Sequence, residues 1–342
     1  MKKWYIDAGP DSDVVVSSRV RLARNVQAYP FPHRSSNEQQ EKIISETCEA
    51  LFTDNPILEK SLDLVRFKDI SPIEKQVMVE KHLISKELVE SNLETGALIS
   101  KDEQISIMIN EEDHLRIQCL ASGMQLDKVF DLCNLLDDTI SEKIDIAYND
   151  KIGYLTSCPT NVGTGIRVSL MLHLPALVMT GYIRPVLESC GKLGVAVRGL
   201  YGENTEAYGN MYQLSNQITL GKSEKDIVMS IQNIGGQVIE QERLLRKELI
   251  KKNPGKLEDR IMRSYGILRF CRMLTSEEAL KRLSDLRLGI NLGYIKELSE
   301  TDINEMVLNI QPGNLLKDAR KMLKPEERDT KRAEYVRNRI NN

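Results

Sequence analysis

The pattern of hydrophobic residues changes at Asn253-Pro254-Gly255, and this change divides the chain of 342 residues into two unlike parts. Before it, short alternating segments typical of β-strands are mixed with longer amphipathic segments typical of helices. After it, only helical patterns follow, over 257–271, 276–286, 301–310 and 325–340. Proline and glycine together break regular structure. We therefore expect an α+β domain over residues 1–252 and a small all-helical domain over 256–342.

The first part of the chain predicts a sheet flanked by helices. The expected strands are 97–100, 104–110, 114–120, 167–174, 195–200 and 211–220. The expected helices are 37–52, 126–148, 176–193 and 223–251. Ser71-Pro72-Ile73-Glu74 starts another helix, because serine caps it, proline suits its first turn and the glutamate completes a capping box. The order of the strands does not follow from these patterns.

Composition narrows the classes of function. With 41% hydrophobic residues the chain can bury a sizeable core, and its net charge of −3 provides no overall field for nucleic acid or acidic membranes. The most apolar stretch, 170–183, is interrupted by His173 and Pro175, and the N-terminus lacks the apolar run of a secretory signal, so no membrane span is expected. The six cysteines form no CxxC pair, which argues against structural zinc and fits a reducing cytoplasm.

Two arginines alternate within the strand-like segment Ser17-Ser18-Arg19-Val20-Arg21. Residues two apart on a strand project from the same face. Two guanidinium groups on one face suit the oxygens of a phosphate, which accept paired hydrogen bonds. A solvated basic strand would show the same pattern, so other segments have to decide between these interpretations.

Three consecutive acids, Glu111, Glu112 and Asp113, stand between two of the expected strands. Acids clustered at a strand end can bind a metal, accept a cation or act as a base, although a charged turn is the plainer interpretation. Arg116 follows on the next strand, where the alternation of apolar residues places it on the face opposite the core. It is a further candidate for contact with a phosphate.

The segment Cys158-Pro159-Thr160-Asn161-Val162-Gly163-Thr164-Gly165, followed by Arg167, is the most unusual of the chain. Its glycines allow a tight turn and a close approach of the backbone to a ligand. It is neither a Walker A loop nor a dinucleotide-binding fingerprint. Cys158 stands where hydrogen-bond donors can stabilise a thiolate, but a small buried side chain fits the sequence equally well.

Two further pairs of charged residues complete the set. Arg198 and Glu203 flank a turn bounded by glycines, where they can serve a phosphate and a cation together or form a surface ion pair. Arg328 and Arg332 are four apart on an expected helix and so lie on one face. They can grip a phosphorylated guanidinium, with Asp329 facing its cationic side, or belong to a solvated basic helix.

In this order the first four segments resemble the catalytic domain of the phosphagen (guanidino) kinases, the family of creatine and arginine kinases. The resemblance covers roughly residues 13–246 and rests above all on Asn110-Glu111-Glu112-Asp113-His114-Leu115-Arg116 and on Cys158-Pro159-Thr160-Asn161 with Gly163-Thr164-Gly165. The chain departs from that family because the N-terminal helical domain is missing and a C-terminal helical domain is added. This architecture is similar to the bacterial protein arginine kinases, whose phosphoarginine-binding motif matches Arg328-Asp329-Thr330-Lys331-Arg332-Ala333.

The resemblance implies a phosphagen-kinase-like fold, an antiparallel-rich sheet flanked by helices, and a role for each motif. Five arginines are implied to bind the phosphates of ATP: Arg19, Arg21, Arg116, Arg167 and Arg198. The phosphates are implied to carry Mg²⁺, which takes no ligand from a protein side chain. Further nucleotide contacts are implied for Ser17, Ser18, Val20, His82, Val168, Ser169, Leu170, Met171, Gly199, Leu200, Tyr201 and Gly202. Glu112 is implied as the catalytic carboxylate, Glu203 as its partner on the substrate guanidinium, and Cys158 as a residue that tunes the substrate site. Residues 328–333 are implied to sense phosphoarginine and to feed back on activity.

The chemistry of the residues agrees with these roles. The arginine guanidinium, with a pKa of about 12.5–13.8, is a poor nucleophile at neutral pH. A pair of carboxylates can orient this planar group and accept a proton as its nitrogen attacks. Phosphoryl transfer otherwise depends on positioning and charge stabilisation, which five arginines supply. We therefore expect Glu112→Ala to abolish activity while ATP binding largely survives.

We interpret the chain as a cytoplasmic, ATP-dependent protein arginine kinase. The resemblance implies that it marks exposed arginines of damaged proteins, or of a stress-gene repressor, for a Clp ATPase and protease. It also implies a zinc-binding activator protein as a partner and a homodimer formed through the helical domain; neither nucleic acid nor a membrane is expected as a partner. One alternative is a free-arginine phosphagen kinase, against which the missing N-terminal domain argues. Another is a phosphoarginine-binding adaptor with a dead kinase domain, against which the intact Glu112, Glu203 and arginines argue.

Overall fold

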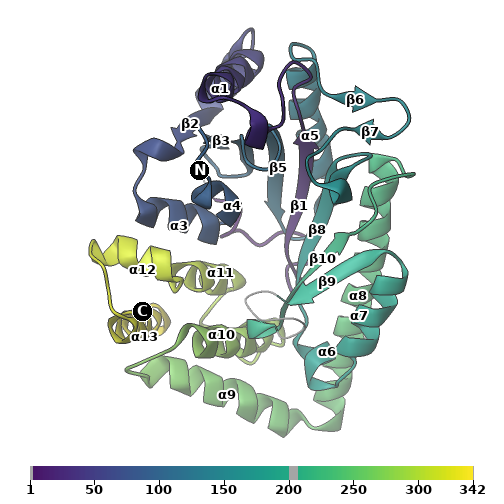
Figure 1. The fold of residues 1–342 in the computed structure, drawn as a ribbon. Coiled ribbons are helices and arrows are strands. Elements are labelled where there is room, and N and C mark those ends of the chain that lie inside the picture. The colour runs from purple at the N-terminus through teal and green to yellow at the C-terminus, as the bar shows by residue number, and fades with distance from the viewer. Residues whose placement is uncertain (1–2, 200–206, 342) are drawn as a thin grey trace.

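The computed structural model describes residues 3–199 and 207–341. Within these ranges one eight-stranded sheet has the order β2-β3-β4-β5-β1-β8-β10-β9, and every neighbouring pair is antiparallel (Figure 1). Its strands are β1 (Val15–Arg24), β2 (Leu62–Arg66), β3 (Gly96–Ser100), β4 (Ile105–Ile109), β5 (Leu115–Ser122), β8 (Ile166–His173), β9 (Val195–Gly199) and β10 (Met211–Asn216). A separate hairpin joins β6 (Tyr148–Asn149) to β7 (Gly153–Tyr154).

Helices surround this sheet and then replace it. The helices before Asn253 are α1 (Asn37–Phe52), α2 (Pro56–Ser61), α3 (Pro72–Glu80), α4 (Lys86–Glu90), α5 (Leu126–Ser141), α6 (Pro175–Met179), α7 (Ile183–Lys192) and α8 (Glu224–Lys252). The helices after it are α9 (Pro254–Phe270), α10 (Ser276–Asn291), α11 (Glu300–Asn309), α12 (Pro312–Ala319) and α13 (Pro325–Asn341). Figure 1 shows α9–α13 gathered in one group beside α3 and the lower end of the sheet. Within the described ranges, no helix combines the length and apolar character that crossing a membrane requires.

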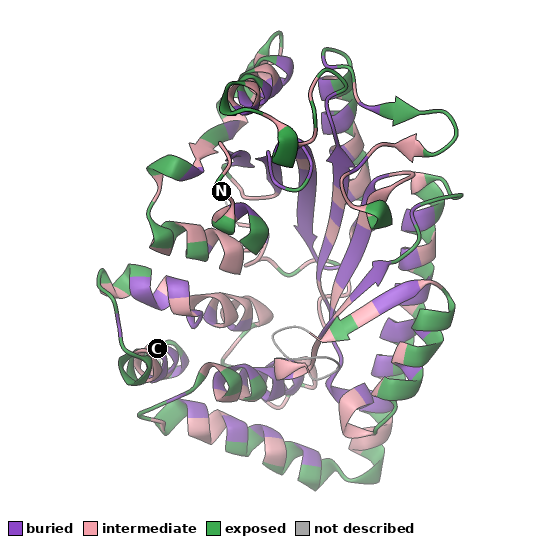
Figure 2. Ribbon diagram, in the orientation of Figure 1, coloured by how far each residue is buried: buried purple, intermediate pink, exposed green. Residues whose placement is uncertain are grey.

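The two faces of the sheet differ in chemistry. Val20 and Leu22 of β1, with Val168 and Leu170 of β8, point to one face and are fully buried in the main core with residues of α1, α5 and α8. This layer gives the sheet its buried colour in Figure 2. On the other face a smaller apolar cluster around Met108 covers the β3–β4 end. The middle of that second face carries polar side chains, and the candidate site lies there.

The structure confirms the α+β prediction and most of the expected elements. The helix expected over 37–52 is α1, and the capping box of Ser71 and Glu74 opens α3. The long helix after Ser223 is α8, whose own capping box uses Asp226. The strands expected over 97–100, 104–110, 114–120 and 167–174 are β3, β4, β5 and β8, with ends shifted by one or two residues.

Two elements end earlier than the sequence predicted, and a third is divided in two. The helix expected over 126–148 stops at Ser141, because the chain turns back and the Ala147 N–H donates to the carbonyl of Asn25. The helix expected over 176–193 is two helices, since Gly181 between them takes a φ of 78°. The strand expected over 211–220 ends at Asn216, whose side-chain amide bonds the backbone of β8.

The helices after Asn253 pack around their own apolar cluster, which includes Leu283, Leu286 and Val336. The expected helices 257–271, 276–286, 301–310 and 325–340 correspond to α9, α10, α11 and α13. The sequence patterns did not predict α12, because it begins with Pro312-Gly313-Asn314, residues that favour turns. Its first turn is stabilised from outside: the Glu80 carboxylate accepts hydrogen bonds from the N–H groups of Gly313 and Asn314 at 2.6 and 3.1 Å.

Candidate active site

Arginines from three adjacent strands meet on the open face of the sheet. The register pairs Arg21 of β1 with Arg167 of β8, and Arg19 lies two residues before Arg21. Arg116 of β5 pairs with Ala23, two residues after Arg21. Directly paired residues, and residues two apart on a strand, share a face of a sheet. The four guanidinium side chains therefore leave the sheet on the same side, and the alternation of the sequence had predicted a common face for Arg19 and Arg21.

This arginine cluster (Arg19, Arg21, Arg116 and Arg167) is poor in counter-charge. The Nε atoms of Arg21 and Arg167 are buried and have no hydrogen-bond partner in the part of the chain that the structure describes. Burial and the charges of Arg19 and Arg116 hold the pKa of Arg21 well below its ordinary value. Burial, with repulsion from Arg116 and Arg167, lowers the pKa of Arg19 to about 10. Crowded, desolvated guanidinium groups such as these are stabilised by an anion that bonds several of them at once.

Neutral side chains orient Arg19 and Arg167 without neutralising their charge. Arg19 donates from Nε to the Ser169 hydroxyl at 3.3 Å and from Nη2 to Oε1 of Gln213 at 3.1 Å. Arg167 donates from Nη2 to the Ser215 hydroxyl at 3.3 Å. These bonds restrict the orientation of both planar groups without adding a counter-charge. Ser169, expected at the nucleotide, thus touches the cluster directly.

The acidic turn between β4 and β5 gives each of its three acids a different environment. Glu111 is almost completely buried, and both its carboxylate oxygens accept from Nη1 of Arg116, at 2.6 and 2.7 Å. The hydroxyl of Ser85, which also caps α4, donates to the same carboxylate. Glu111 therefore positions Arg116.

Asp113 connects the acidic turn to two other segments of the chain by hydrogen bonds. Its Oδ1 accepts hydrogen bonds from the Asn25 side-chain amide at 2.6 Å and from the backbone N–H of Ser157 at 2.7 Å. The carbonyl oxygen of the Asn25 side chain accepts from the N–H of His114 at 2.9 Å. The turn is thereby connected to the end of β1 and to the residue before Cys158.

Glu112 is the exposed member of the three acids, and it lines one pocket with Arg21, Arg116 and Arg167. Partial burial, followed by the charges of Asp113 and Glu111, raises the pKa of Glu112 above its ordinary value. A hydrogen bond with the side chain of Cys158 acts in the opposite direction. A carboxyl group with a raised pKa beside a cationic pocket is suited to accept a proton.

The glycine-rich loop brings Cys158 to this pocket. Gly163 and Gly165 have φ angles of 109° and 64°, which favour glycine. A Cβ on Gly163 would lie 2.4 Å from the carbonyl oxygen of Thr219, so no larger residue fits without a shift of the backbone. Cys158 is half-buried, and its Sγ lies 3.0 Å from the Thr160 hydroxyl. The loop thus places a thiol against Glu112, which the sequence pattern alone did not decide.

The positions expected along a nucleotide divide between the two faces. Ser17, His82 and Met171 line a cleft next to the arginine cluster. In contrast, four of the expected residues have side chains on the other face of the sheet, against the main core. They are Ser18 and Val20 of β1 and Val168 and Leu170 of β8. The hydroxyl of Ser18, for example, donates to the carbonyl of Gly123 at 2.7 Å. Strand alternation therefore turns these four side chains away from the arginine cluster, and the nucleotide contacts expected for these residues stay a prediction.

Arg198 lies on the same face as the arginine cluster. It is exposed on β9, just before Gly199, and pairs with Gln213, the residue that orients Arg19. Leu200, Tyr201, Gly202 and Glu203, for which roles were expected, lie outside the described residues.

The motif over residues 328–333 lies on α13, far along the chain from the arginine cluster. Arg332 is 2% exposed and donates to the carbonyls of Ile310 and Leu274, at 2.9 and 2.8 Å, and to Asp329 at 2.6 Å. Ala333 is fully buried, whereas Thr330 and Lys331 are exposed. The expected joint grip of Arg328 and Arg332 is not seen, because Arg332 holds α13 to its neighbours and Asp329 pairs with Arg332. Arg328 is half-exposed.

Sequence reasoning missed the residues that support the site. Ser85 and Asn25 hold Glu111 and Asp113, yet no motif or spacing links either to the acidic turn. Only the capping signal of Ser85 was available in the sequence, and it indicates a helix start. Among the described residues, no three His, Cys, Asp or Glu side chains form a group that could hold a metal ion.

Comparison with known proteins agrees with this geometry. The model of the ATP:guanido phosphotransferase C-terminal catalytic domain matches residues 42–245, and that of the protein-arginine kinase McsB C-terminal domain matches residues 254–342. Two curated relatives, each called protein-arginine kinase, come from Geobacillus sp. (strain WCH70) and Bacillus subtilis (strain 168). Each is 50% identical over 342 residues, covering 99% of this chain and 94% and 93% of the respective relative.

Solved structures of guanidino kinases share the fold. The duplicated taurocyamine kinase from Schistosoma mansoni, with bound transition state analog components, has a TM-score of 0.62 and 25% identity, covering 78% of this chain and 38% of that one. Lombricine kinase has a TM-score of 0.61 and 22% identity, covering 70% and 69% of the two chains. From the matched family models and the full-length relatives, the chain belongs to the ATP:guanido phosphotransferase family and, within it, to the protein-arginine kinases.

Proposed function

We propose that this chain transfers the γ-phosphate of ATP to the guanidinium group of arginine residues in proteins. The observation that carries the proposal is the under-neutralised arginine cluster with the exposed Glu112 at its edge. The names of the relatives support arginine in proteins as the acceptor. The chain's family supports ATP as the donor.

In this proposal the arginine cluster and Arg198 bind the phosphates of ATP. Their donors are directed at the space where negative charge develops during transfer, and electrostatic stabilisation of this kind dominates phosphoryl transfer. Mg²⁺, carried by the phosphates, adds further charge neutralisation. Ser17, His82, Ser169 and Met171 contact the rest of the nucleotide.

Glu112 acts as the base and Glu203 as its partner on the acceptor. A nitrogen of the arginine side chain forms a bond to the γ-phosphorus, the bond from that phosphorus to the β-bridging oxygen breaks, and ADP leaves. The proton of the attacking nitrogen passes to the carboxylate of Glu112. Cys158, which hydrogen-bonds to Glu112, adjusts the basicity of that carboxylate.

The entrance beside Glu112 supports a cationic side chain on a protein as the acceptor. Glu112 and Arg116 line an open cleft together with Glu87, Glu90 and Ser91 of the α4 region. The negative potential of these carboxylates favours the approach of arginine. The cleft is open to the surface, so an arginine attached to a polypeptide can enter.

The test is phosphorylation in the presence of Mg-ATP, with casein or free arginine as the acceptor. We expect acid-labile phosphate on arginyl residues of casein. Glu112→Gln is expected to lower the rate by at least about 10²-fold, while Glu142→Gln, an exposed glutamate at the end of α5, leaves it unchanged. Label on free arginine alone would favour a phosphagen kinase, and label on neither acceptor would favour a dead adaptor.

We further propose that residues 256–342 form a separate domain whose 328–333 motif reads phosphoarginine, with Arg328 as the contact and Arg332 as the residue that positions α13. The match to the McsB C-terminal domain supports this proposal. Arg328→Ala is expected to weaken phosphoarginine binding about tenfold by calorimetry, whereas Arg339→Ala, an exposed arginine of the same helix outside the motif, is the matched control. Equal affinity of the Arg328 variant and the unmodified protein would overturn this role.

The same resemblance supports the proposed partners. These are a Clp ATPase and protease that receive the marked proteins, a stress-gene repressor as a substrate, a zinc-binding activator protein, and a second copy of this chain in a homodimer. The proposed location of these encounters is the cytoplasm.

A further inference from the structure

A stripe of polar side chains on α10 faces the ends of strands that carry the arginine cluster. The stripe consists of Ser284, Arg287 and Asn291, which are three and four residues apart and therefore lie on one side of the helix. Ser284 and Arg287 are almost completely buried. The apolar neighbours Leu283 and Leu286 belong to the core of the C-terminal helices. The polar stripe serves contacts outside that core.

Ser284 connects the last residue of β8 with the residue before β10. Its Oγ lies 2.7 Å from Nε2 of His173, which ends β8, and accepts a hydrogen bond of 2.7 Å from Nδ2 of Asn210. Asn210 has a φ of 55°, and its carbonyl accepts from the N–H of Leu174. Met211 follows as the first residue of β10 and pairs with His173. One hydroxyl group thus joins two neighbouring strands at one end.

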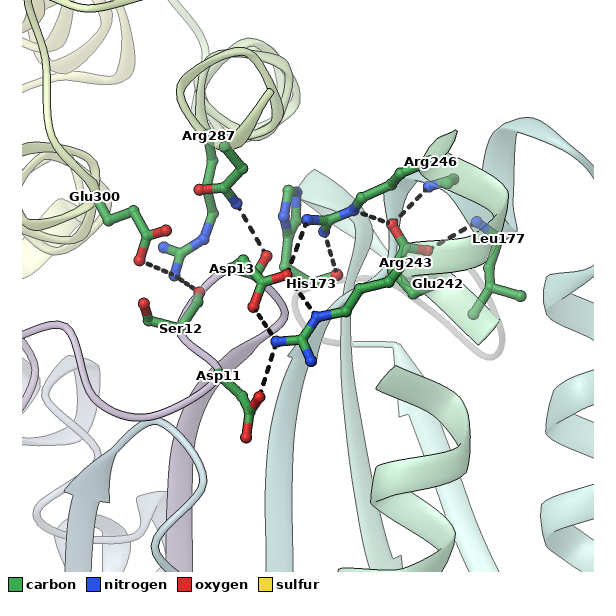
Figure 3. Close-up of polar contacts among 12 residues, drawn as sticks. Asp11, Ser12, Asp13, His173, Leu177, Glu242, Arg243, Arg246, Arg287 and Glu300 are labelled. Carbon is green, nitrogen blue, oxygen red and sulfur yellow. Dashed lines mark hydrogen bonds and ion pairs between the residues drawn. The ribbon is translucent and has the colours of Figure 1, made fainter. Parts of the chain in front are cut away.

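Arg287 and Asn291 hold the segment that leads into β1. Arg287 donates to the carbonyl of Ser12 at 2.9 Å, and the side-chain amide of Asn291 donates to the carbonyl of Asp13 at 2.9 Å. Figure 3 shows Arg287 of α10 and Arg243 of α8 reaching this segment, where Arg243 bonds the carboxylate of Asp13. The chain is therefore fixed by two helices directly before the strand begins.

The burial of Arg287 is not explained by a close ion pair. The carboxylate of Glu300 lies 4.0 Å away, and Nε of Arg287 has no hydrogen-bond partner within the described ranges. A buried guanidinium with so little counter-charge costs folding free energy. Its hydrogen bonds go to the carbonyl of Ser12 and, at 2.6 Å, to Oδ1 of Asn304 on α11. The side chain thus fixes the positions of its partners at a cost in stability.

The three strands held in this way are those whose side chains orient Arg19. Arg19 stands on β1 and donates to Ser169 of β8 at 3.3 Å and to Gln213 of β10 at 3.1 Å. Both distances are long for N–H···O hydrogen bonds, so a small relative shift of the strands weakens them. Repulsion from Arg116 and Arg167 acts on the same guanidinium group. The orientation of Arg19 therefore depends on how firmly the ends of β1, β8 and β10 are held.

We propose that Ser284, Arg287 and Asn291 are positioning residues for phosphate binding, which act through Arg19 and make no contact with the ligand themselves. The inference rests on the proposed function only for the identity of these phosphates as those of ATP. The stripe lies within residues 254–342, which match the McsB C-terminal domain. The C-terminal helices thus supply part of the rigidity of the phosphate site on the sheet.

The test measures the affinity for inorganic tripolyphosphate, which has the phosphates of ATP without its base and binds without turnover. Ser284→Ala is expected to raise the Kd by calorimetry roughly fivefold, as expected when one charge-assisted contact is partly lost. Asn291→Ala removes a single hydrogen bond at a half-buried position and is the milder variant, with an expected rise of roughly two- to threefold. The matched control is Ser264→Ala, because this buried serine of α9 donates to Asp285 within the C-terminal helices.

A double substitution distinguishes positioning from a general loss of stability. Arg19→Met weakens tripolyphosphate binding by itself, and in that background Ser284→Ala is expected to add less than about twofold, since residues that act through one another are not additive. A full fivefold loss in both backgrounds would overturn the inference, and so would equal Kd values for Ser284→Ala and Ser264→Ala. Urea unfolding shows whether each variant is folded at the temperature of the assay. If Ser284→Ala is not, the same comparisons with Asn291→Ala decide.

Failure of this inference and failure of the proposed function give different results. If the variants weaken tripolyphosphate binding as expected but the unmodified protein makes no phosphoarginine, the proposed function fails and this inference stands. If casein is phosphorylated on arginine but the Kd for tripolyphosphate is unchanged in the variants, this inference fails alone. The KM for casein is expected to stay within about twofold in Ser284→Ala, because the entrance beside Glu112 lies at the turn between β4 and β5.

Discussion

At the scale of single residues, the acidic turn shows how different surroundings give three neighbouring carboxylates different properties. Glu111 is sequestered by Arg116 and Ser85, and Asp113 by Asn25 and the backbone of Ser157. Glu112 keeps access to solvent and to the arginine cluster. Partial burial, together with the charges of the two buried acids, raises the pKa of Glu112, which suits it to the proposed role of base.

The raised pKa of Glu112 sets the pH dependence of activity. The carboxylate has to be unprotonated to accept a proton, so kcat/KM is expected to fall as the pH decreases through a pKa above 4.5. The same shift means that the folded state holds this proton more tightly. Glu112 therefore opposes folding at neutral pH, and this cost is relieved as the pH falls towards 4.5.

Cys158 offers a direct check, because its hydrogen bond lowers the pKa of Glu112. In Cys158→Ala the acid limb of the pH–rate profile is expected to move to higher pH, and in Cys271→Ala, at the end of α9, it stays where it is. A profile that does not move in Cys158→Ala would mean that the thiol does not act through Glu112.

At the scale of elements, α13 depends on one buried side chain. Arg332 bonds the end of α11 through Ile310 and the connection between α9 and α10 through Leu274. Arg332 thereby connects α13 with two segments that lie elsewhere in the sequence. Arg328, four residues earlier on α13, is half-exposed.

The two arginines of this motif should therefore differ in their effect on stability. Arg332→Ala leaves two buried carbonyls without their donor and is expected to lower the free energy of unfolding by about 2–4 kcal/mol. Arg328→Ala is expected to change it by less than about 1 kcal/mol. Urea unfolding followed by circular dichroism measures both, and equal losses would show that Arg332 is not the anchor.

At the scale of the whole molecule, the arginine cluster makes the unliganded protein electrostatically unfavourable. Burial and mutual repulsion lower the pKa values of Arg19, Arg21 and Arg167, so the charged forms cost folding free energy at neutral pH. A polyanion relieves this cost, and anything that binds only the folded state stabilises it.

Tripolyphosphate is therefore expected to raise the melting temperature. At 100 times its Kd the stabilisation is about 2.7 kcal/mol, which corresponds to roughly 4 °C for a chain of this size. Arg21→Met should melt no lower than the unmodified protein without the anion, and should lose most of the response. A full response in Arg21→Met, measured by differential scanning calorimetry, would show that the anion binds elsewhere.

Much of the candidate site follows from local patterns. The alternation along β1 predicted a common face for Arg19 and Arg21, because side chains on a strand alternate with a period of two. The same period shows why Val168 and Leu170 face the core, although the family resemblance assigned them to the nucleotide. The end of the helix at Ser141 and the existence of α12 depend on contacts with Asn25 and Glu80, which no local pattern contains.

The sequence by itself determined the class of fold, the change to helices after Asn253 and which residues carry charge. These properties depend on periodicity and composition, which short segments of the chain already contain. The tertiary structure alone decided which of three acids stays exposed, that Arg332 is buried, and that α11 lies across the cleft beside Ser17 and Met171. These outcomes depend on contacts between residues that are far apart in the sequence. The desolvation and hydrogen bonds that distinguish one charged side chain from another arise only when that pairing has formed.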